Sequence, residues 1–345
     1  MPDEDERPPA LRAGCTRPVR AHGAPTRKQA RGPHWRRTSH GFYVPSSVPT
    51  DSVDQRIVEA SVVVPPRCAI NGWASLRWRG GRWFDGLGPA REPLPVGIVI
   101  SSHDVRPQPG IALSAEAFDP RLVEWVDGVP VIDARYAVAF QMRYARSWRA
   151  AANELSKAAY NDLVSIEEMT QFLTPGQNGM TGVPQARRAL GWAEENVWSP
   201  YELPMSLLWQ VEADRPRPLC NRPIFDLAGR HVATPDLFDP VTGVGGEYDG
   251  ELHLDRGQRD RDLRRDGALR HYDLELVYAT APDLHDPRAF VGRLHDAYRR
   301  AARRQVSDRT WTIEPPAWWV PVDTVEQRRA LTAQQRRRFL GHRTA

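Results

Sequence analysis

The sequence predicts an α/β chain with an α+β domain in its upstream half. Short extended runs alternate with segments whose apolar residues recur at helical spacing, which is typical of mixed folds. The 345 residues and 41% hydrophobic composition allow two domains, each with its own core. A third observation is a hairpin-like stretch, residues 234–253, that gathers several ionisable side chains. We therefore expect two domains, with the chemistry in the second.

Residues 1–33 are rich in Pro, Arg, Ala and Gly and contain few core-forming residues, so we expect a disordered basic arm. The arm has no acidic residue after Glu6, and it could contact phosphates, although a solvated tail is the commoner reason for such a run. From His34 to Pro45, polar and apolar residues alternate like a short hairpin.

The upstream domain, 34–190, is expected to mix helices and strands. Helices are predicted at Gln55–Val64, where two prolines follow, and at Cys68–Trp78. Strands are predicted at Pro95–Ile100 and Gly110–Ser114, with a hairpin turning at Asp127 and Gly128. Further helices are predicted at Ala134–Arg146, Arg149–Ala159, from the capping box at Ser165, and at Gln185–Asn196. Glycine and proline gather from Thr174 to Pro184, so we place the domain split between Thr174 and Trp198.

The stretch after Thr234 reads as one antiparallel hairpin. Pro235–Phe238 begins a strand, residues 239–243 supply turn chemistry, and Val244–Tyr248 returns. In this pairing Asp236 faces Glu247 across the hairpin, and the alternation of faces puts Asp249 beside Glu247. By the same alternation Tyr248 should point into a core.

Carboxylates held this close repel each other unless a proton or a hard cation joins them. Oxygen ligands on rigid strands suit Mg²⁺ or Mn²⁺. We therefore predict a divalent metal site with Asp236 and Glu247 as its ligands.

This hairpin resembles the PD-(D/E)XK nuclease superfamily, in particular its very-short-patch-repair-like branch. The resemblance is carried by Pro-Asp at 235–236, Glu-Tyr-Asp-Gly at 247–250 and a histidine at 253. Upstream, Ser-Pro-Tyr-Glu at 199–202 resembles the first helix of that branch; downstream, residues 261–269 resemble its charged helix and 274–280 a later strand. The resemblance covers 198–304 and implies a restriction-endonuclease-like fold, a mixed central sheet flanked by helices.

The resemblance implies a catalytic set made of Glu202, Asp236, Glu247, Asp249 and His253. The lysine position of the superfamily is Asp249 here, and the only lysines of the chain are Lys28 and Lys157. The very-short-patch-repair-like branch also lacks this lysine and uses a histidine, so the resemblance makes His253 our candidate for water activation, and a free pKa near 6.5 suits that role. The alternative is an inactive fold whose polar residues bind nucleic acid or cap turns.

Arginines after the hairpin are the candidates for contact with DNA backbone phosphates, which fixes position but not sequence: Arg256, Arg259, Arg264 and Arg265. After residue 304 we expect a C-terminal extension, 305–345, with a basic helix from Thr324 to Leu340. It follows an amphipathic helix from Pro287 to Arg304.

The upstream half resembles the abortive-infection AbiEi type of antitoxin and its actinobacterial relatives. The residues that carry this resemblance are 37–45, 70–77 and 127–131. That family usually begins with a winged helix, whereas the segment before His34 is too rich in proline to form its helices. Whether the chain contains a winged helix that recognises DNA therefore stays open from the sequence.

Composition limits the remaining classes. Cys15, Cys68 and Cys220 are isolated and lack metal or disulfide spacing, which fits a reducing cytoplasm. The acidic N-terminus lacks the apolar core of a signal peptide, and no apolar stretch is long enough to span a bilayer. The formal net charge is +4, and the positively charged side chains are almost all arginine. This composition is compatible with binding to nucleic acid and equally with a high-GC coding sequence.

Two functions remain open from the sequence. The first is a Mg²⁺-dependent DNA endonuclease. The second is a non-cleaving, antitoxin-type regulator that binds operator DNA or a cognate toxin protein.

Overall fold

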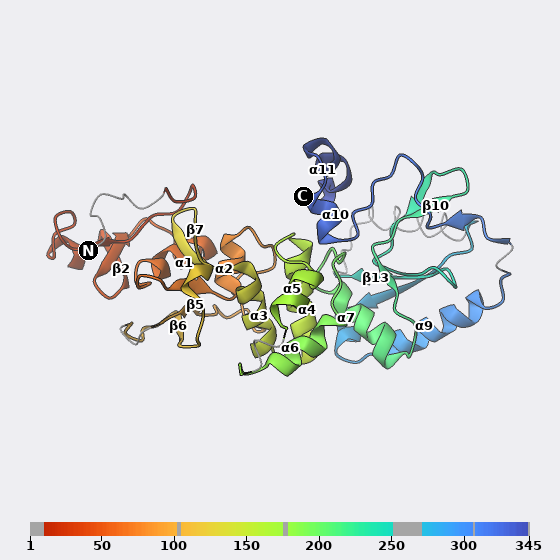
Figure 1. The fold of residues 1–345 in the computed structure, drawn as a ribbon, viewed down its shortest axis with the longest axis horizontal. Helices are drawn as coiled ribbons and strands as arrows, with labels where there is room; N and C mark the ends of the chain where they lie inside the picture. Colours follow the sequence, from red (N-terminus) through yellow and green to blue (C-terminus); the bar gives the residue numbers. More distant parts are fainter. Residues whose placement is uncertain (1–9, 102–104, 175–178, 251–270, 306–307, 344–345) are drawn as a thin grey trace. The chain divides into compact units, whose positions relative to one another are not determined.

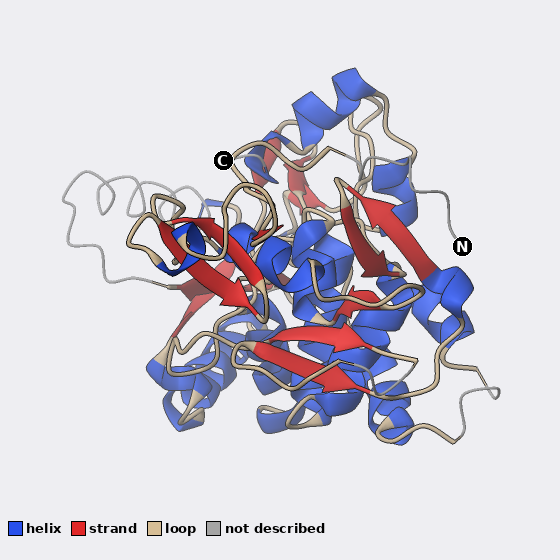
Figure 2. Ribbon diagram, turned by 90° about the vertical axis from the view of Figure 1, so that its left-hand side faces the viewer, coloured by secondary structure: helices blue, strands red, loops and turns tan. Residues whose placement is uncertain are grey.

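The computed structural model describes residues 10–101, 105–174, 179–250, 271–305 and 308–343. The chain divides into two compact units, Met1–Tyr144 and Ala145–Ala345. Both units contain helices and strands; Figure 2 draws the helices in blue and the strands in red. The predicted mixed α/β class is therefore confirmed at this level.

The first unit is built on a five-stranded mixed sheet of order β6-β5-β4-β8-β7. Its strands are β4 (Ala69–Asn71), β5 (Val96–Val99), β6 (Ile111–Ser114), β7 (Val123–Val126) and β8 (Val129–Ile132). Helices α1 (Val53–Ser61) and α2 (Trp73–Trp78) pack against the central strands, and α3 (Ala134–Tyr144) packs on α2. The predicted strands 95–100 and 110–114 are confirmed as β5 and β6, and the hairpin at Asp127 as the antiparallel pair β7–β8.

The predicted helix Cys68–Trp78 is wrong in its first half. Residues Ala69–Asn71 form the central strand β4, and α2 begins only at Trp73. Gly72 has a φ of 61°, which interrupts any continuous helix, and the side chain of Asn71 accepts its N–H at 2.6 Å. A run that is fully buried on both faces has no period to distinguish strand from helix, which explains the error.

Residues 10–33 differ from the disordered arm that the sequence predicted. Strand β1 (Val19–Arg20) pairs with β3 (Phe42–Pro45), which in turn pairs with β2 (Trp35–Ser39), as the predicted hairpin requires. The buried Gln55 side chain bonds both the N–H and the C=O of Thr16, at 2.8 and 2.9 Å. The Arg12 guanidinium lies 4.3 Å from the ring centroid of Trp78. Polar and cation–π contacts thus order a segment that has little apolar surface. Residues 1–9 lie outside the described part.

The second unit begins with helices. These are α4 (Trp148–Tyr160), α5 (Ile166–Phe172), α6 (Val183–Leu190) and α7 (Glu202–Leu207), which continues into a π-helical turn, Leu208–Glu212. The capping box predicted at Ser165 is present. Helix α6 begins two residues before the predicted Gln185–Asn196 and ends at Leu190, with Gly191 as its C-cap residue.

A four-stranded mixed sheet of order β14-β13-β12-β9 follows these helices. It contains β9 (Leu219–Cys220), β12 (Leu237–Asp239), β13 (Val244–Asp249) and β14 (Glu275–Thr280). Strand β13 is antiparallel to β12 and parallel to β14. Helix α9 (Arg288–Ala301) packs against β13 and β14, and α7 contacts β13 (Figure 1). The predicted hairpin and the strand at 274–280 are confirmed.

The second unit also contains a three-stranded sheet of order β11-β10-β15. Its strands are β10 (Ile224–Asp226), β11 (His231–Ala233) and β15 (Trp311–Thr312). Ile224, Phe238, Leu274 and Trp311 are buried together and join it to the four-stranded sheet. The remaining short helical turns are Gln29–Arg31, Pro120–Leu122, Pro282–Leu284 and Gly341–Arg343.

The predicted final helix from Thr324 to Leu340 is two helices, α10 (Val325–Arg329) and α11 (Ala333–Phe339). Thr332 breaks the run because its hydroxyl accepts the N–H of Gln335 and starts a new capping box. The Asp162 carboxylate holds this segment by pairing with the buried Arg328 at 2.7 Å and with Arg336 at 3.4 Å.

The boundary between the two compact units lies upstream of the interval 174–198, where the sequence predicted a split. Helices α4 to α6 accordingly belong to the second unit. The predicted domain bounds 34–190, 198–304 and 305–345 stay a prediction. Within the described ranges, no helix is both long enough and apolar enough to cross a membrane.

Candidate functional site

The candidate site lies at the end of the β12–β13 hairpin that is remote from its turn. The register pairs Leu237 with Gly246, so the next pair outward sets Asp236 across from Glu247. Both side chains are half-buried, whereas Asp249 at the end of β13 is exposed. The alternation of faces puts Glu247 and Asp249 on one side of β13. The register thus sets Asp236 across from Glu247, and Asp249 lies two residues further along β13.

Asp236 is fixed by the backbone on both of its sides. Its Oδ2 accepts the N–H of Tyr248 at 2.7 Å, and its C=O accepts the N–H of Asn221 at 2.9 Å. The first bond directs the carboxylate toward β13, where Glu247 lies. A carboxylate held this way is preorganised, since it needs no rearrangement to meet a ligand.

Glu202 approaches the same place as the first residue of α7. Leu203, Met205 and Leu207 are buried and anchor the helix, which leaves Glu202 at its N-terminal end as predicted. The Glu202 side chain is itself buried, at 3% exposure. Its Oε2 accepts the N–H of Trp198 at 2.7 Å and the amide of Asn221 at 2.6 Å.

Burial and the nearby Asp236 carboxylate together raise the pKa of Glu202 to about 8. Below that pH the Glu202 carboxyl is mostly neutral, because the pocket does not stabilise two adjacent negative charges. Perturbed carboxyls of this kind concentrate at functional sites, although structural networks also produce them. The electrostatic influence of Asp236 shows that the two groups are neighbours.

Asn221 connects the Glu202 carboxyl to the backbone of Asp236, and the sequence reasoning missed it. Its amide nitrogen donates to Glu202 and, at 2.7 Å, to the C=O of Asn196, while its own N–H holds Asp236. Asn221 is buried and has a φ of 48°, a conformation that asparagine tolerates better than most residues. The available signal was an asparagine just before Arg222 and Pro223, which reads as an ordinary turn.

The chemical type of the candidate ligand atoms suits a hard divalent cation. All candidate donors are oxygens, and the buried Oδ1 of Asn221 has no hydrogen-bond partner among the residues that the structure describes. Within the same residues, no three His, Cys, Asp or Glu side chains gather closely enough to form a metal-binding group. The predicted metal pair of Asp236 and Glu247 therefore stays a prediction.

Several predicted site residues lie outside the described part of the chain. These are His253, Arg256, Arg259, Arg264 and Arg265. Their assigned roles in water activation and phosphate contact stay predictions. The predicted burial of Tyr248 in a core is wrong: the side chain is half-buried and stacks on the exposed Tyr201.

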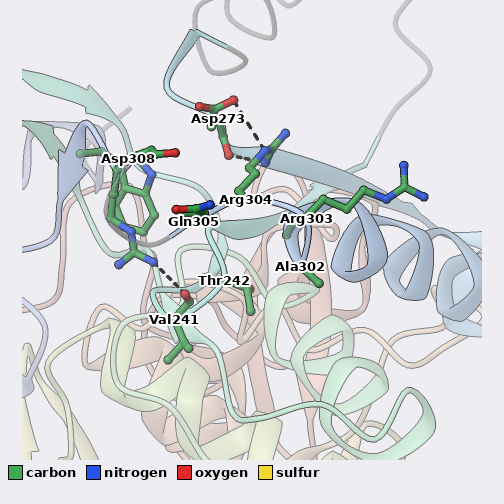
Figure 3. Close-up of a pocket in the computed structure, with 11 residues that line it drawn as sticks. Val241, Thr242, Asp273, Ala302, Arg303, Arg304, Gln305 and Asp308 are labelled. Atoms are coloured by element: carbon green, nitrogen blue, oxygen red, sulfur yellow. Dashed lines mark hydrogen bonds and ion pairs between the residues drawn. The ribbon is translucent and has the colours of Figure 1, made fainter.

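A pocket of about 520 Å³ lies at the turn end of the same hairpin, away from the carboxylates. Figure 3 shows Arg304 directed toward Asp273, and Val241 and Thr242 of the turn on the other side of the pocket. Arg304 also donates to Glu275 at 2.6 Å, and Arg309 donates to the C=O of Val241 at 2.7 Å. These two arginines have protein partners, so the pocket adds no residue to the candidate site.

Comparison with known proteins adds nothing to this geometry: no family model, no curated protein and no solved structure matches the chain.

Proposed function

We propose that the second unit is a metal-dependent DNA endonuclease whose site is formed by Asp236, Glu247 and Glu202. The observation that carries the proposal is the buried Glu202 carboxyl next to Asp236, whose strand register sets it across from Glu247. Such groups are costly to hold together unless a cation or a proton is shared among them. A bound cation would offset this cost, so the arrangement favours a cation-dependent function.

The fold around the site supports the proposal. A mixed sheet with a helix that delivers Glu202 and a second helix, α9, packed on β13 and β14 is what a restriction-endonuclease-like core requires. The resemblance of residues 235–236 and 247–250 to the PD-(D/E)XK motif supports the same assignment.

Mg²⁺ or Mn²⁺ bound here would polarise the scissile phosphate and lower the pKa of a bound water. The residues of the chain have distinct tasks around it. Asp236 and Glu247 provide the ligand oxygens, and the N–H of Tyr248 keeps Asp236 aimed at β13. Glu202, once ionised, is placed to act as an outer ligand or to accept a proton. His253 and Asp249 are the candidates for orienting the attacking water.

The test is an assay of purified protein on plasmid and single-stranded DNA with Mg²⁺, Mn²⁺ or EDTA. We expect cleavage with either metal, none in EDTA, and none by Asp236→Asn. Asp286→Asn is the matched control, because Asp286 is an exposed aspartate of the same unit that pairs with Arg288 beside it. This control should cut like wild type.

The regulator is the other outcome of this assay. Wild-type protein that cuts no DNA with either metal, yet binds DNA with a steep dependence on salt, would replace the nuclease proposal by an antitoxin-type binding function.

A further inference from the structure

Two tyrosines form a parallel stack beside the carboxylates. The ring centroids of Tyr201 and Tyr248 are 4.8 Å apart, and the ring planes differ by 12°. Tyr201 directly precedes Glu202, and Tyr248 lies between Glu247 and Asp249 on β13. Both rings are thus attached to the backbone segments that position the proposed site.

Tyr248 is held by the protein, whereas Tyr201 is exposed. The backbone N–H of Tyr248 donates to the Asp236 carboxylate at 2.7 Å, and the Tyr248 side chain is half-buried. Tyr201 is 49% exposed, and its hydroxyl has no hydrogen bond to any described residue. One flat aromatic face therefore remains available to solvent next to the carboxylates.

Local stability does not explain a tyrosine at position 201. Tyr201 is the N-cap of α7 and provides no side-chain cap, although Ser, Thr, Asp or Asn would add roughly 1 kcal/mol there. The helix start is held instead by Glu202, which accepts the N–H of Trp198. Helix capping therefore leaves the tyrosine at position 201 without a structural role of its own, apart from its contact with Tyr248.

We infer that the Tyr201–Tyr248 stack is a subsite for one unpaired nucleobase of a single-stranded nucleic acid, adjacent to the cleavage site. This inference deepens the proposed nuclease function and rests on it for the identity of the ligand. A base that stacks on Tyr201 would extend the existing two-ring stack by a third ring, in the geometry that aromatic groups prefer.

The chemistry favours an unpaired base over intact duplex. Both faces of a base inside a duplex are covered by its neighbours, so only a single strand, a frayed end or an extruded nucleotide can offer a free face. Stacking is also tolerant of sequence, because every base has a π-face. The substrate class is therefore single-stranded or locally opened nucleic acid.

The test is a pair of fluorescence-anisotropy titrations of the full chain, with a labelled single-stranded oligonucleotide and with the same sequence as a blunt duplex. One series is run in EDTA, where a metal-dependent reaction does not proceed, and one in Mg²⁺. The variants are Tyr201→Ala and Tyr201→Phe. Tyr144→Ala is the matched control, because Tyr144 is 52% exposed and also packs on a ring, that of Phe140, in the other unit.

We expect Tyr201→Ala to weaken single-strand binding by about 5- to 150-fold, the usual worth of one base–aromatic stack. Tyr201→Phe should bind like wild type because it retains the ring. Duplex affinity should not change, and the salt dependence of binding should be the same in all variants, since the ring contacts no phosphate. Tyr144→Ala should match wild type.

The inference is overturned if wild type does not bind single strands in either series, or if Tyr201→Ala leaves their affinity unchanged. It is also overturned if single-strand and duplex affinities fall equally, or if Tyr144→Ala has the same effect. Failure of the proposed function looks different: protein that never cuts, yet loses single-strand affinity on Tyr201→Ala, keeps the subsite and loses the nuclease. Conversely, if the protein cuts DNA but Tyr201→Ala leaves the single-strand affinity unchanged, the nuclease proposal stands and the subsite inference fails.

Discussion

The substitution Glu202→Gln should remove a distinct pH dependence from the stability of the second unit. The pKa of Glu202 is about 8 in the folded protein, against an ordinary value of 4.5. The folded state therefore retains a proton that the unfolded state has lost. The contribution is fully present below pH 4.5, declines as pH rises between the two values, and is lost above the folded pKa.

The expected slope follows from linkage. Where the unfolded chain binds one proton fewer, the free energy of unfolding falls by about 1.4 kcal/mol per pH unit. Between pH 6 and pH 8 wild type should therefore lose about 2–3 kcal/mol more than Glu202→Gln. The glutamine keeps an oxygen to accept from Trp198 and Asn221 but has no proton to lose.

The assay is urea denaturation of wild type and Glu202→Gln across pH 5–9, in EDTA, with the transition of the second unit followed separately if the two units unfold apart. Glu314→Gln, at an exposed glutamate of the same unit, is the control and should keep the wild-type slope. Equal slopes for wild type and Glu202→Gln would refute the reasoning, because Glu202 would then titrate normally. A steeper slope in the variant would refute it as well.

Three further predictions concern the surroundings of the site and the C-terminal segment. Asn221→Ala removes a hydrogen bond that lowers the pKa of Glu202, so the pH-dependent fall in stability should extend to higher pH in the same denaturation assay. Asp162→Ala leaves the buried Arg328 without its carboxylate. We expect the free energy of unfolding to fall by about 3 kcal/mol, the low end for a broken buried pair, because two backbone carbonyls still accept from Arg328. Trypsin should also cleave earlier within residues 325–343. His253→Ala should slow metal-dependent cleavage by roughly 10²–10⁴-fold with DNA affinity unchanged, and cleavage at the wild-type rate would make His253 a structural residue.

The sequence could predict elements whose pattern is local. The β12–β13 hairpin followed from turn residues between two short apolar runs, and its register then put Asp236 across from Glu247. The capping box at Ser165 and the amphipathic helix α9 were local in the same sense. The position of Glu202 at the start of a helix followed from the leucines that come after it in the sequence.

The remaining features depend on long-range contacts that no local pattern contains. Strand β4 is central in its sheet and buried on both faces, so its apolar run did not differ from that of a helix. The order of residues 10–33 depends on Gln55, about 40 positions away from Thr16, through two hydrogen bonds. Asn221 joins Glu202 and Asp236 from a turn that carries no motif. The exposed stack of Tyr201 on Tyr248 needs the contact between α7 and β13.

The central claim, that Asp236 and Glu247 hold a divalent cation beside Glu202, is tested most directly by titrating Mn²⁺ into the protein at pH 7 and measuring bound metal by electron paramagnetic resonance. We expect a binding site in wild type and in Asp286→Asn that is absent from Asp236→Asn and from Glu247→Gln. We also expect proton release on binding, because the neutral Glu202 carboxyl should ionise next to the cation. Mn²⁺ binding that is equally strong in Asp236→Asn and wild type, without proton release, would contradict the claim.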